Sequence, residues 1–181
     1  ADDLIGSALT IARRQGIPSL ILSADKDLSQ LLGEHDEQWD YAKNVRWRLA
    51  GVKAKHGVHA HQLADYLGLT GDAVDNIPGV PGIGPKTAAT LLSHFGSLDE
   101  LLDKVDEIPY LRLRSAAQHC QKLREHRDMA LLSRKLATIR CDIPLADEQT
   151  LGMRGPSDQN ALTALIEQLR FGPLTRRRLI S

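Results

Sequence analysis

The segment that decides the fold is LGLTGDAVDNIPGVPGIGPKTA, which runs from Leu67 to Ala88. Asp72 and Asp75 are carboxylates placed to hold a divalent metal ion. A turn rich in glycine follows them and opens a helix: Gly79, Gly82, Gly84, Pro85 and Lys86. Such a turn presents free backbone N–H groups, and a helix N-terminus attracts anions. The segment therefore indicates a metal site beside a phosphate-binding turn, as expected of an enzyme that cuts a nucleic-acid backbone.

The order of glycine and proline in this turn supports the same interpretation. Positions with positive φ, or with close approach to another backbone, favour glycine, and Pro78 and Pro81 stiffen the turn between them. The pattern hydrophobic-Pro-Gly-Ile-Gly resembles the turn of the helix–hairpin–helix DNA-binding element. The alternative is an ordinary loop between two helices.

Composition is that of an ordinary globular chain. Its 181 residues suffice for one domain with a real core, or for a domain with a small appendage. The formal net charge is zero and only 4% of residues are aromatic, so stacking on many unpaired bases is not favoured. The two cysteines, Cys120 and Cys141, form no Cys-x-x-Cys pair and are expected to be free thiols. No apolar run of membrane-spanning length and no signal peptide is visible, so we predict a cytoplasmic protein without a membrane partner.

The first third of the chain reads as half of a parallel α/β unit. An apolar stripe predicts a helix over residues 1–15, and Ser19–Ser23 reads as a short buried strand. The acidic Asp25-Lys26-Asp27 follows at the carboxyl end of that strand, where open α/β sheets place their ligands. A short helix over residues 28–32 and a hairpin or short strands over residues 38–49 are expected next.

The rest of the chain reads as helical. Helices over residues 59–67 and 85–95 should flank the glycine turn, and Ser97 with Glu100 forms a capping-box pattern that opens another helix. We expect a long amphipathic helical stretch over residues 110–137 and a helix near residues 158–170, broken at Gly172 and Pro173. The predicted organisation is an α/β core over residues 1–57 and a helical DNA-binding region over residues 58–181.

Six aspartates fall in three short clusters: Asp2 and Asp3, Asp25 and Asp27, and Asp72 and Asp75. Each cluster alone has a plain explanation, respectively favourable charge at a helix N-terminus, N-caps, and turn residues. Together they form a dense set of carboxylates that cations must neutralise, and Mg²⁺ or Mn²⁺ prefers such ligands. Two ions roughly 4 Å apart would suit phosphodiester hydrolysis.

At these residues the chain resembles the 5′ nuclease (flap endonuclease) superfamily, which includes the nuclease domain of bacterial DNA polymerase I, phage flap endonucleases and exonuclease IX. The resemblance runs from Ala1-Asp-Asp3 through Ser23–Leu28 and Gly71–Gly79, and weakly to Phe171-Gly-Pro-Leu174. It implies a partial PIN-like or resolvase-like parallel sheet core, followed by a mostly helical region with a helix–two-turn–helix. It also implies a metal-dependent 5′-3′ exonuclease or flap endonuclease of DNA replication and repair.

The resemblance also implies residue roles. Asp2 and Asp3 would serve the first metal site, Asp25 and Asp27 the metal pair, and Asp72 and Asp75 the second site. A potassium ion would be held by the backbone carbonyls of Leu69, Thr70, Pro78, Val80 and Ile83. A branched or nicked DNA duplex with a 5′ end would be the partner, and its strand would meet backbone N–H groups of one segment: Gly82, Ile83, Gly84, Pro85, Lys86 and Thr87. Pro85 belongs to this segment although it has no N–H.

The sequence departs from the family at its start. The Glu of the family's Glu-Ala-Asp-Asp motif is absent, as are the preceding core strand, its acidic residues and the helical arch. We therefore expect a piece of a bacterial or phage-like, nucleoid-associated nuclease whose missing N-terminal half, or a fused polymerase, would be its partner. This polypeptide alone is expected to be weakly active or inactive. The rivals are a non-catalytic helix–hairpin–helix DNA-binding module and a PIN-type ribonuclease.

Overall fold

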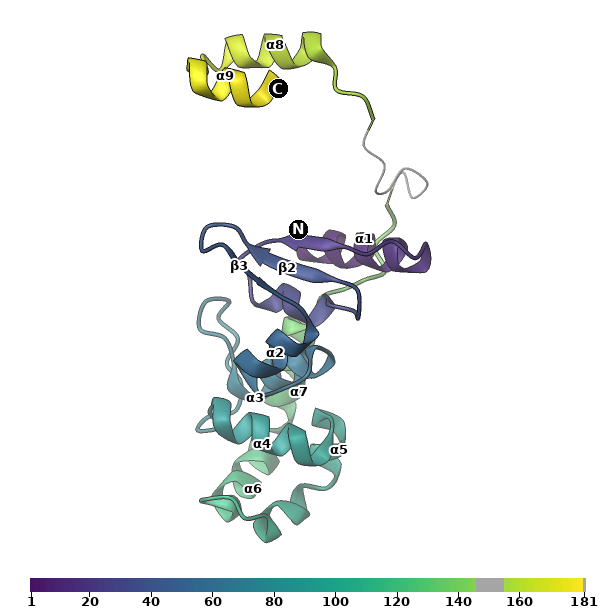
Figure 1. The fold of residues 1–181 in the computed structure, drawn as a ribbon. Helices are drawn as coiled ribbons and strands as arrows, with labels where there is room; N and C mark the ends of the chain where they lie inside the picture. Colours follow the sequence, from purple (N-terminus) through teal and green to yellow (C-terminus); the bar gives the residue numbers. More distant parts are fainter. Residues whose placement is uncertain (146–154, 181) are drawn as a thin grey trace. The chain divides into compact units, whose positions relative to one another are not determined.

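The computed structural model describes residues 1–145 and 155–180. The chain divides into two compact units, residues 1–151 and 152–181, and each is described by itself (Figure 1). Within the first unit, a small sheet with its helices lies next to a helical region. The expected α/β class is confirmed.

The sheet is built by the first 47 residues. Its three strands are β1 (Leu20–Leu22), β2 (Glu37–Asp40) and β3 (Val45–Trp47), in the order β1-β2-β3. β1 pairs parallel with β2, and β2 pairs antiparallel with β3, which confirms the expected short strands. Helix α1 (Asp2–Arg14) precedes β1, and the 3₁₀ helix η1 (Asp27–Leu31) follows it.

One expectation for β1 is wrong. We expected a buried strand, but Leu20 is 49% exposed and Leu22 is 62% exposed, and only Ile21 is buried. The physical reason is that successive side chains of a strand point to opposite faces of the sheet, and in β1 only Ile21 lies on the face that packs against the helices. Ile21 shares a hydrophobic cluster with Leu9 of α1 and Leu28 of η1.

The helical region follows the sheet. Its elements are α2 (Leu49–His56), η2 (Ala60–Gln62), α3 (Leu63–Thr70), α4 (Pro85–Phe95), α5 (Leu98–Asp103), η3 (Val105–Tyr110), α6 (Ala116–Glu125) and α7 (Arg127–Ala137). The flanking helices of the glycine turn are confirmed as α3 and α4. Ser97 caps α5 as predicted, since its hydroxyl accepts a hydrogen bond from the Glu100 amide at 3.2 Å.

The single helical stretch expected over residues 110–137 is wrong. Ser115 has a positive φ of 59°, so no helix enters α6 from before it, and α6 and α7 are separated at His126. Arg127 fixes the start of α7, because its guanidinium donates to the Leu102 carbonyl at 2.8 Å and pairs with Asp103 at 3.0 Å. Buried residues recur at intervals of three and four in both helices, so this periodicity does not mark the break between them.

Helices α3 and α7 pack side by side at the centre of the helical core. A Cβ at Gly68 of α3 would lie 2.9 Å from the Arg134 Cβ and 3.1 Å from the Ala130 carbonyl oxygen, so the small residue permits this approach. Arg134 of α7 pairs with Asp65 of α3 at 3.4 Å and with Asp99 of α5 at 2.7 Å. The region that carries the glycine turn is therefore tied to one rigid core.

The second unit is a helical hairpin of α8 (Gln159–Gln168) and α9 (Pro173–Ile180). Asp158 caps α8 through the Asn160 and Ala161 amides, which confirms the expected helix there. The break expected at Gly172 and Pro173 lies between the helices, with Pro173 as the first residue of α9. Helices α2 and α9 were not predicted.

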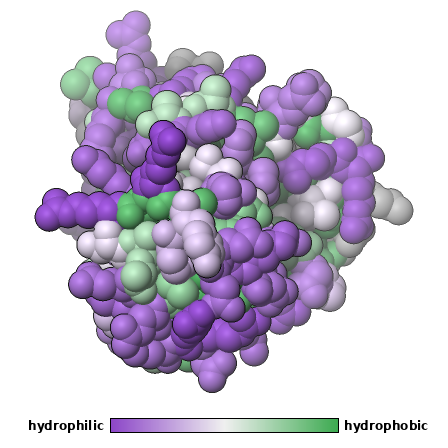
Figure 2. All heavy atoms as spheres, turned by 90° about the horizontal axis from the view of Figure 1, so that it is seen from below, coloured by the Kyte–Doolittle hydropathy of each residue, from purple (hydrophilic) through white to green (hydrophobic). Residues whose placement is uncertain are grey.

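The face of the molecule seen from below is mostly hydrophilic (Figure 2). Figure 2 views the molecule from below, the side on which Figure 1 shows α6, and hydrophobic residues gather there only in small patches. Cys120 is buried and Cys141 is exposed, and both are free thiols. Among the described residues, no helix is both long enough and apolar enough to cross a bilayer.

Candidate metal centre and hairpin turn

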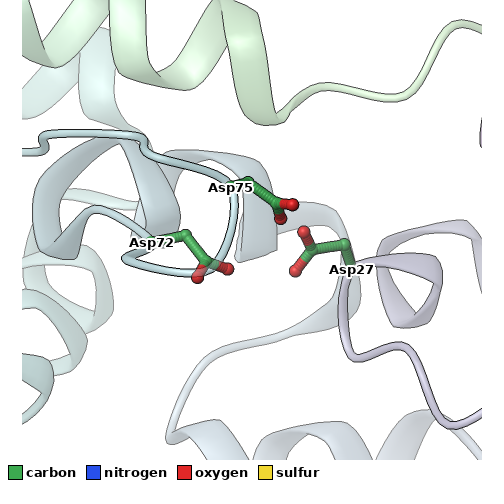
Figure 3. A group of neighbouring side chains, drawn as sticks. All are labelled: Asp27, Asp72 and Asp75. Atoms are coloured by element: carbon green, nitrogen blue, oxygen red, sulfur yellow. The ribbon is translucent and has the colours of Figure 1, made fainter.

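Three aspartates from two distant segments meet at one point. Asp27 begins η1, and Asp72 and Asp75 lie in the loop after α3, and the three carboxylates point toward one another (Figure 3). One carboxylate oxygen from each residue lies within 4.8 Å of the others. Oxygen ligands this close, from residues of one charge, form the donor set that hard divalent cations prefer.

The loop after α3 is shaped by its own sequence. The backbones of Asp72 and Ile77 form two hydrogen bonds of 2.8 Å that close the loop, and Asn76 turns it with a positive φ of 56°. The Asp72 carboxylate accepts from the Val74 amide at 2.9 Å. This Asx turn holds Asp72 and leaves Asp75 exposed at the loop surface.

The segment that carries Asp27 is positioned by a buried glutamine that our sequence analysis did not select. Gln38 of β2 is fully buried, and its amide donates to the carbonyls of Ser23 at 3.1 Å and Asp25 at 2.5 Å. Its side-chain oxygen accepts from the Ser29 hydroxyl at 2.7 Å. Gln38 therefore clamps the segment between β1 and η1 from both sides. The only hint is a polar residue in the middle of a short strand.

The buried carboxylate of Asp27 is short of partners. Its Oδ1 has no hydrogen-bond partner among the described residues, and the side chain is only 13% exposed. Burial raises the pKa of Asp27 to about 6; the Lys26 ammonium opposes this, and the charges of Asp25, Asp72 and Asp75 add to it. An orphaned buried oxygen among like charges is what a bound cation would satisfy, so these residues fit a divalent metal ion.

Asp72 has the opposite electrostatic balance. Burial works to raise the pKa of Asp72, but the hydrogen bond from the Lys26 ammonium and the amides of Val74 and Asp75 hold the pKa below its usual range. The ammonium of Lys26 pairs directly with the Asp72 Oδ2. The cluster thus combines one carboxylate that resists ionisation with one that is held ionised.

These shifts predict how stability depends on pH without metal. An acid whose pKa is raised by folding contributes stability that is present below its unfolded pKa, near 4, and lost as the pH rises through about 6. Chemical denaturation in EDTA should therefore show Asp27 lowering the free energy of unfolding by roughly 2 kcal/mol between pH 4 and pH 7. The difference between the wild type and Asp27→Asn isolates this effect from His56, whose pKa burial lowers. Parallel pH profiles of the two proteins would contradict it.

The other predicted carboxylates have different surroundings. Asp25 accepts from the Asp27 amide at 2.9 Å, so it turns the chain into η1 and lies beside the cluster. Asp2 is exposed in the first turn of α1. Asp3 accepts from the backbone amide of Arg140 at 2.8 Å, which ties α1 to the segment after α7. The structure thus groups Asp27, Asp72 and Asp75, with Asp25 adjacent, and does not bring Asp2 or Asp3 into this group.

The glycine turn packs backbone against backbone. Gly79 has a positive φ of 63°, and a Cβ there would lie 2.6 Å from the Thr70 carbonyl carbon and 2.7 Å from the Gly71 Cα. The Gly79 amide donates to the buried Ser133 hydroxyl at 3.1 Å. The segments that carry the predicted potassium ligands Leu69, Thr70, Pro78 and Val80 therefore touch. Of the five carbonyls predicted to hold potassium, which include Ile83, two already accept amides: Leu69 from Val80 at 2.8 Å and Val80 from Ile83 at 3.0 Å.

The predicted phosphate-binding segment opens α4. Gly84 is its N-cap residue and Pro85 its first residue, with the Ala88 amide donating to Gly84 at 3.0 Å. Pro85 has no N–H, so the free donors of the first turn belong to its neighbours. Gly82, with φ of 80°, leaves room for the Lys122 ammonium of α6 directly above it. Arg124 and Arg127, by contrast, pair with Asp106 and Asp103.

Comparison with known proteins shows the family to which the chain belongs. The family model described as 5′-3′ exonuclease, C-terminal SAM fold, matches residues 58–159. DNA polymerase I of Rhizobium leguminosarum is 37% identical over 177 residues, covering 98% of this chain and 17% of that protein. Flap endonuclease Xni of Shewanella amazonensis is 39% identical over 145 residues, covering 80% of this chain and 54% of that protein.

A solved structure shares the fold. It is the bacteriophage T5 flap endonuclease in a pseudo-enzyme–product complex with DNA and metal ions, with a TM-score of 0.66 at 19% identity. The match covers 93% of this chain and 58% of that one. The chain belongs to the 5′-3′ exonuclease family with the C-terminal SAM fold. It spans about a fifth of the polymerase relatives and about half of the flap endonuclease.

Proposed function

We propose that this chain is part of a divalent-metal-dependent 5′ nuclease that hydrolyses DNA phosphodiesters at branched or nicked duplexes in replication and repair. The observation that carries the proposal is the carboxylate group of Asp27, Asp72 and Asp75. Asp27 contributes an orphaned buried oxygen from the start of η1, and Asp72 and Asp75 lie in the loop that leads directly into the glycine turn. A cation site beside a phosphate-binding turn favours an enzyme over a binding module, because bare carboxylates repel DNA.

In this proposal the carboxylates hold Mg²⁺ or Mn²⁺. Asp27, Asp72 and Asp75 would hold one ion, and Asp25, Asp2 and Asp3 would contribute to the two-ion site of the whole nuclease. Bound there, divalent ions would activate a water and stabilise the leaving oxygen. The chain's own part is to fix the ligand oxygens, through Gln38 below Asp27 and through the Asx turn at Asp72.

The glycine turn would grip the DNA strand. Amides of Gly82, Gly84, Lys86 and Thr87 would meet phosphates, whereas the Ile83 amide, also expected there, donates to the Val80 carbonyl at 3.0 Å. Recognition would depend on backbone shape, not base sequence. A potassium ion at the carbonyls of Leu69, Thr70, Pro78, Val80 and Ile83 is supported by the close packing of the two turns that carry most of them.

The proposal is tested with a 5′-labelled flap duplex, with Mg²⁺ or Mn²⁺ and an EDTA control. We expect salt-sensitive binding of the flap by this chain, and any cleavage should disappear with EDTA and in the Asp72→Asn, Asp75→Asn variant. Cleavage that survives both changes would contradict the metal mechanism. Binding unaffected by metal and by the double variant would favour a non-catalytic DNA-binding module.

Gly84→Ala tests the turn without disturbing the fold. A Cβ at Gly84 meets nothing within 4 Å and its φ of −89° suits alanine, so the poorer N-cap and the stiffer unfolded chain should offset each other and stability should change by less than about 1 kcal/mol. The added methyl stands where a phosphate would approach, so the Kd for the flap duplex should rise about tenfold. Gly155→Ala, also in open space, is the matched control. Equal flap affinities for the two variants would contradict this role.

A further inference from the structure

We infer that Lys26 is a built-in counter-cation of the carboxylate group, whose ammonium competes with the divalent ion for Asp72 and Asp27. The inference rests on the proposed metal site and adds a residue that tunes it. Lys26 therefore has two expected effects: it stabilises the metal-free cluster, and it weakens metal binding.

The position of Lys26 carries the inference. It stands between Asp25 and Asp27 in sequence, yet its side chain reaches across to the loop after α3. Its ammonium pairs with the Asp72 Oδ2 and lies 3.7 Å from the Asp27 Oδ1. That Asp27 oxygen is the one with no hydrogen-bond partner among the described residues. The Lys26 ammonium thus contacts the same carboxylate oxygens that would coordinate a divalent cation.

Because the carboxylates are buried, solvent screens these contacts less than it screens an ordinary surface ion pair. The carboxylates of Asp72 and Asp27 are 5% and 13% exposed, whereas the Lys26 side chain is 38% exposed. Partners of low exposure are weakly screened, so each cation in their neighbourhood raises the free energy of the other. A divalent ion at Asp72 therefore requires the ammonium to move away, and the exposed, flexible lysine stem allows it to swing into solvent.

The test compares Mn²⁺ binding by the wild type and Lys26→Met, which keeps the apolar stem and removes the charge. Calorimetric titration should show Mn²⁺ binding about tenfold tighter in Lys26→Met. Thermal unfolding in EDTA should show a lower Tm for this variant than for the wild type. Lys43→Met is the matched control, because Lys43 pairs with Asp40 at 3.2 Å in the turn between β2 and β3.

The outcomes separate this inference from the proposed function. Equal or weaker Mn²⁺ binding by Lys26→Met, with normal binding by the wild type, would overturn the role of Lys26 and leave the metal site standing. Absence of Mn²⁺ binding in both proteins would overturn both. If Lys26→Met does not fold in EDTA, Lys26→Arg keeps the charge and should restore folding with wild-type Mn²⁺ affinity. Failure of that rescue would overturn the inference.

Discussion

Replacing Gly79 with alanine should destabilise the chain by on the order of 4 kcal/mol or more. The φ of 63° disfavours any side chain, and the new Cβ would overlap the backbone of Thr70 and Gly71, which no rotamer change relieves. Separation of the two turns would also break the hydrogen bond from the Gly79 amide to Ser133. Urea denaturation followed by circular dichroism measures the loss.

Gly84→Ala is the control for this prediction, because it places the same methyl five residues further along, in open space. The two variants should differ by several kcal/mol in the free energy of unfolding. Similar stabilities would show that the close approach of the Gly71 and Gly79 backbones does not hold the hairpin, and the proposed potassium site would lose its geometric support.

Asp27→Asn should raise the stability of the metal-free protein and reduce the stabilisation by Mn²⁺. Without metal, removing the charge relieves the cost of burying it and, to a smaller extent, the repulsion by Asp25, Asp72 and Asp75, and this outweighs the lost attraction to Lys26. Above pH 7 the variant should therefore be more stable by roughly 2 kcal/mol. With Mn²⁺ at 100 times its Kd, the wild type should gain about 2.7 kcal/mol and the variant much less. Thermal unfolding in EDTA and in Mn²⁺ measures both changes.

Asp128→Asn makes the same change of charge at an exposed position in the first turn of α7, away from the cluster. It should keep the full Mn²⁺ response and lose only the few tenths of a kcal/mol expected from the helix dipole. A variant at Asp27 that responds to Mn²⁺ as the wild type does would show that this carboxylate is not a ligand.

Much of this architecture could be predicted because local chemistry determines it. Gly84 and Pro85 mark the start of α4, and Ser97 marks the start of α5, because capping and fixed φ act within a few residues. Helix α2 escaped prediction because only Val52 of its eight residues is buried, so it has no apolar stripe. The exposure of Leu20 and Leu22 depends on which face of the sheet the helices cover, and a short apolar run does not report this.

In the candidate site, too, features determined by local sequence could be predicted and features that depend on long-range contacts could not. Asp27, Asp72 and Asp75 were candidates because their spacing and neighbours are local. The use of Asp3 by the Arg140 amide joins residues 137 positions apart, and the clamp of Gln38 on Asp25 depends on strand pairing. The reach of Lys26 to Asp72 likewise depends on how η1 packs beside α3. Side-chain contacts between distant segments carry no local signature.

The most direct test of the central claim is a calorimetric titration of Mn²⁺ into this chain at pH 8, where Asp27 is ionised, beside the Asp72→Asn, Asp75→Asn variant. We predict saturable binding by the wild type and none by the variant. A variant that binds Mn²⁺ with wild-type affinity, or a wild type that binds none, would contradict the assignment of Asp27, Asp72 and Asp75 as a metal centre.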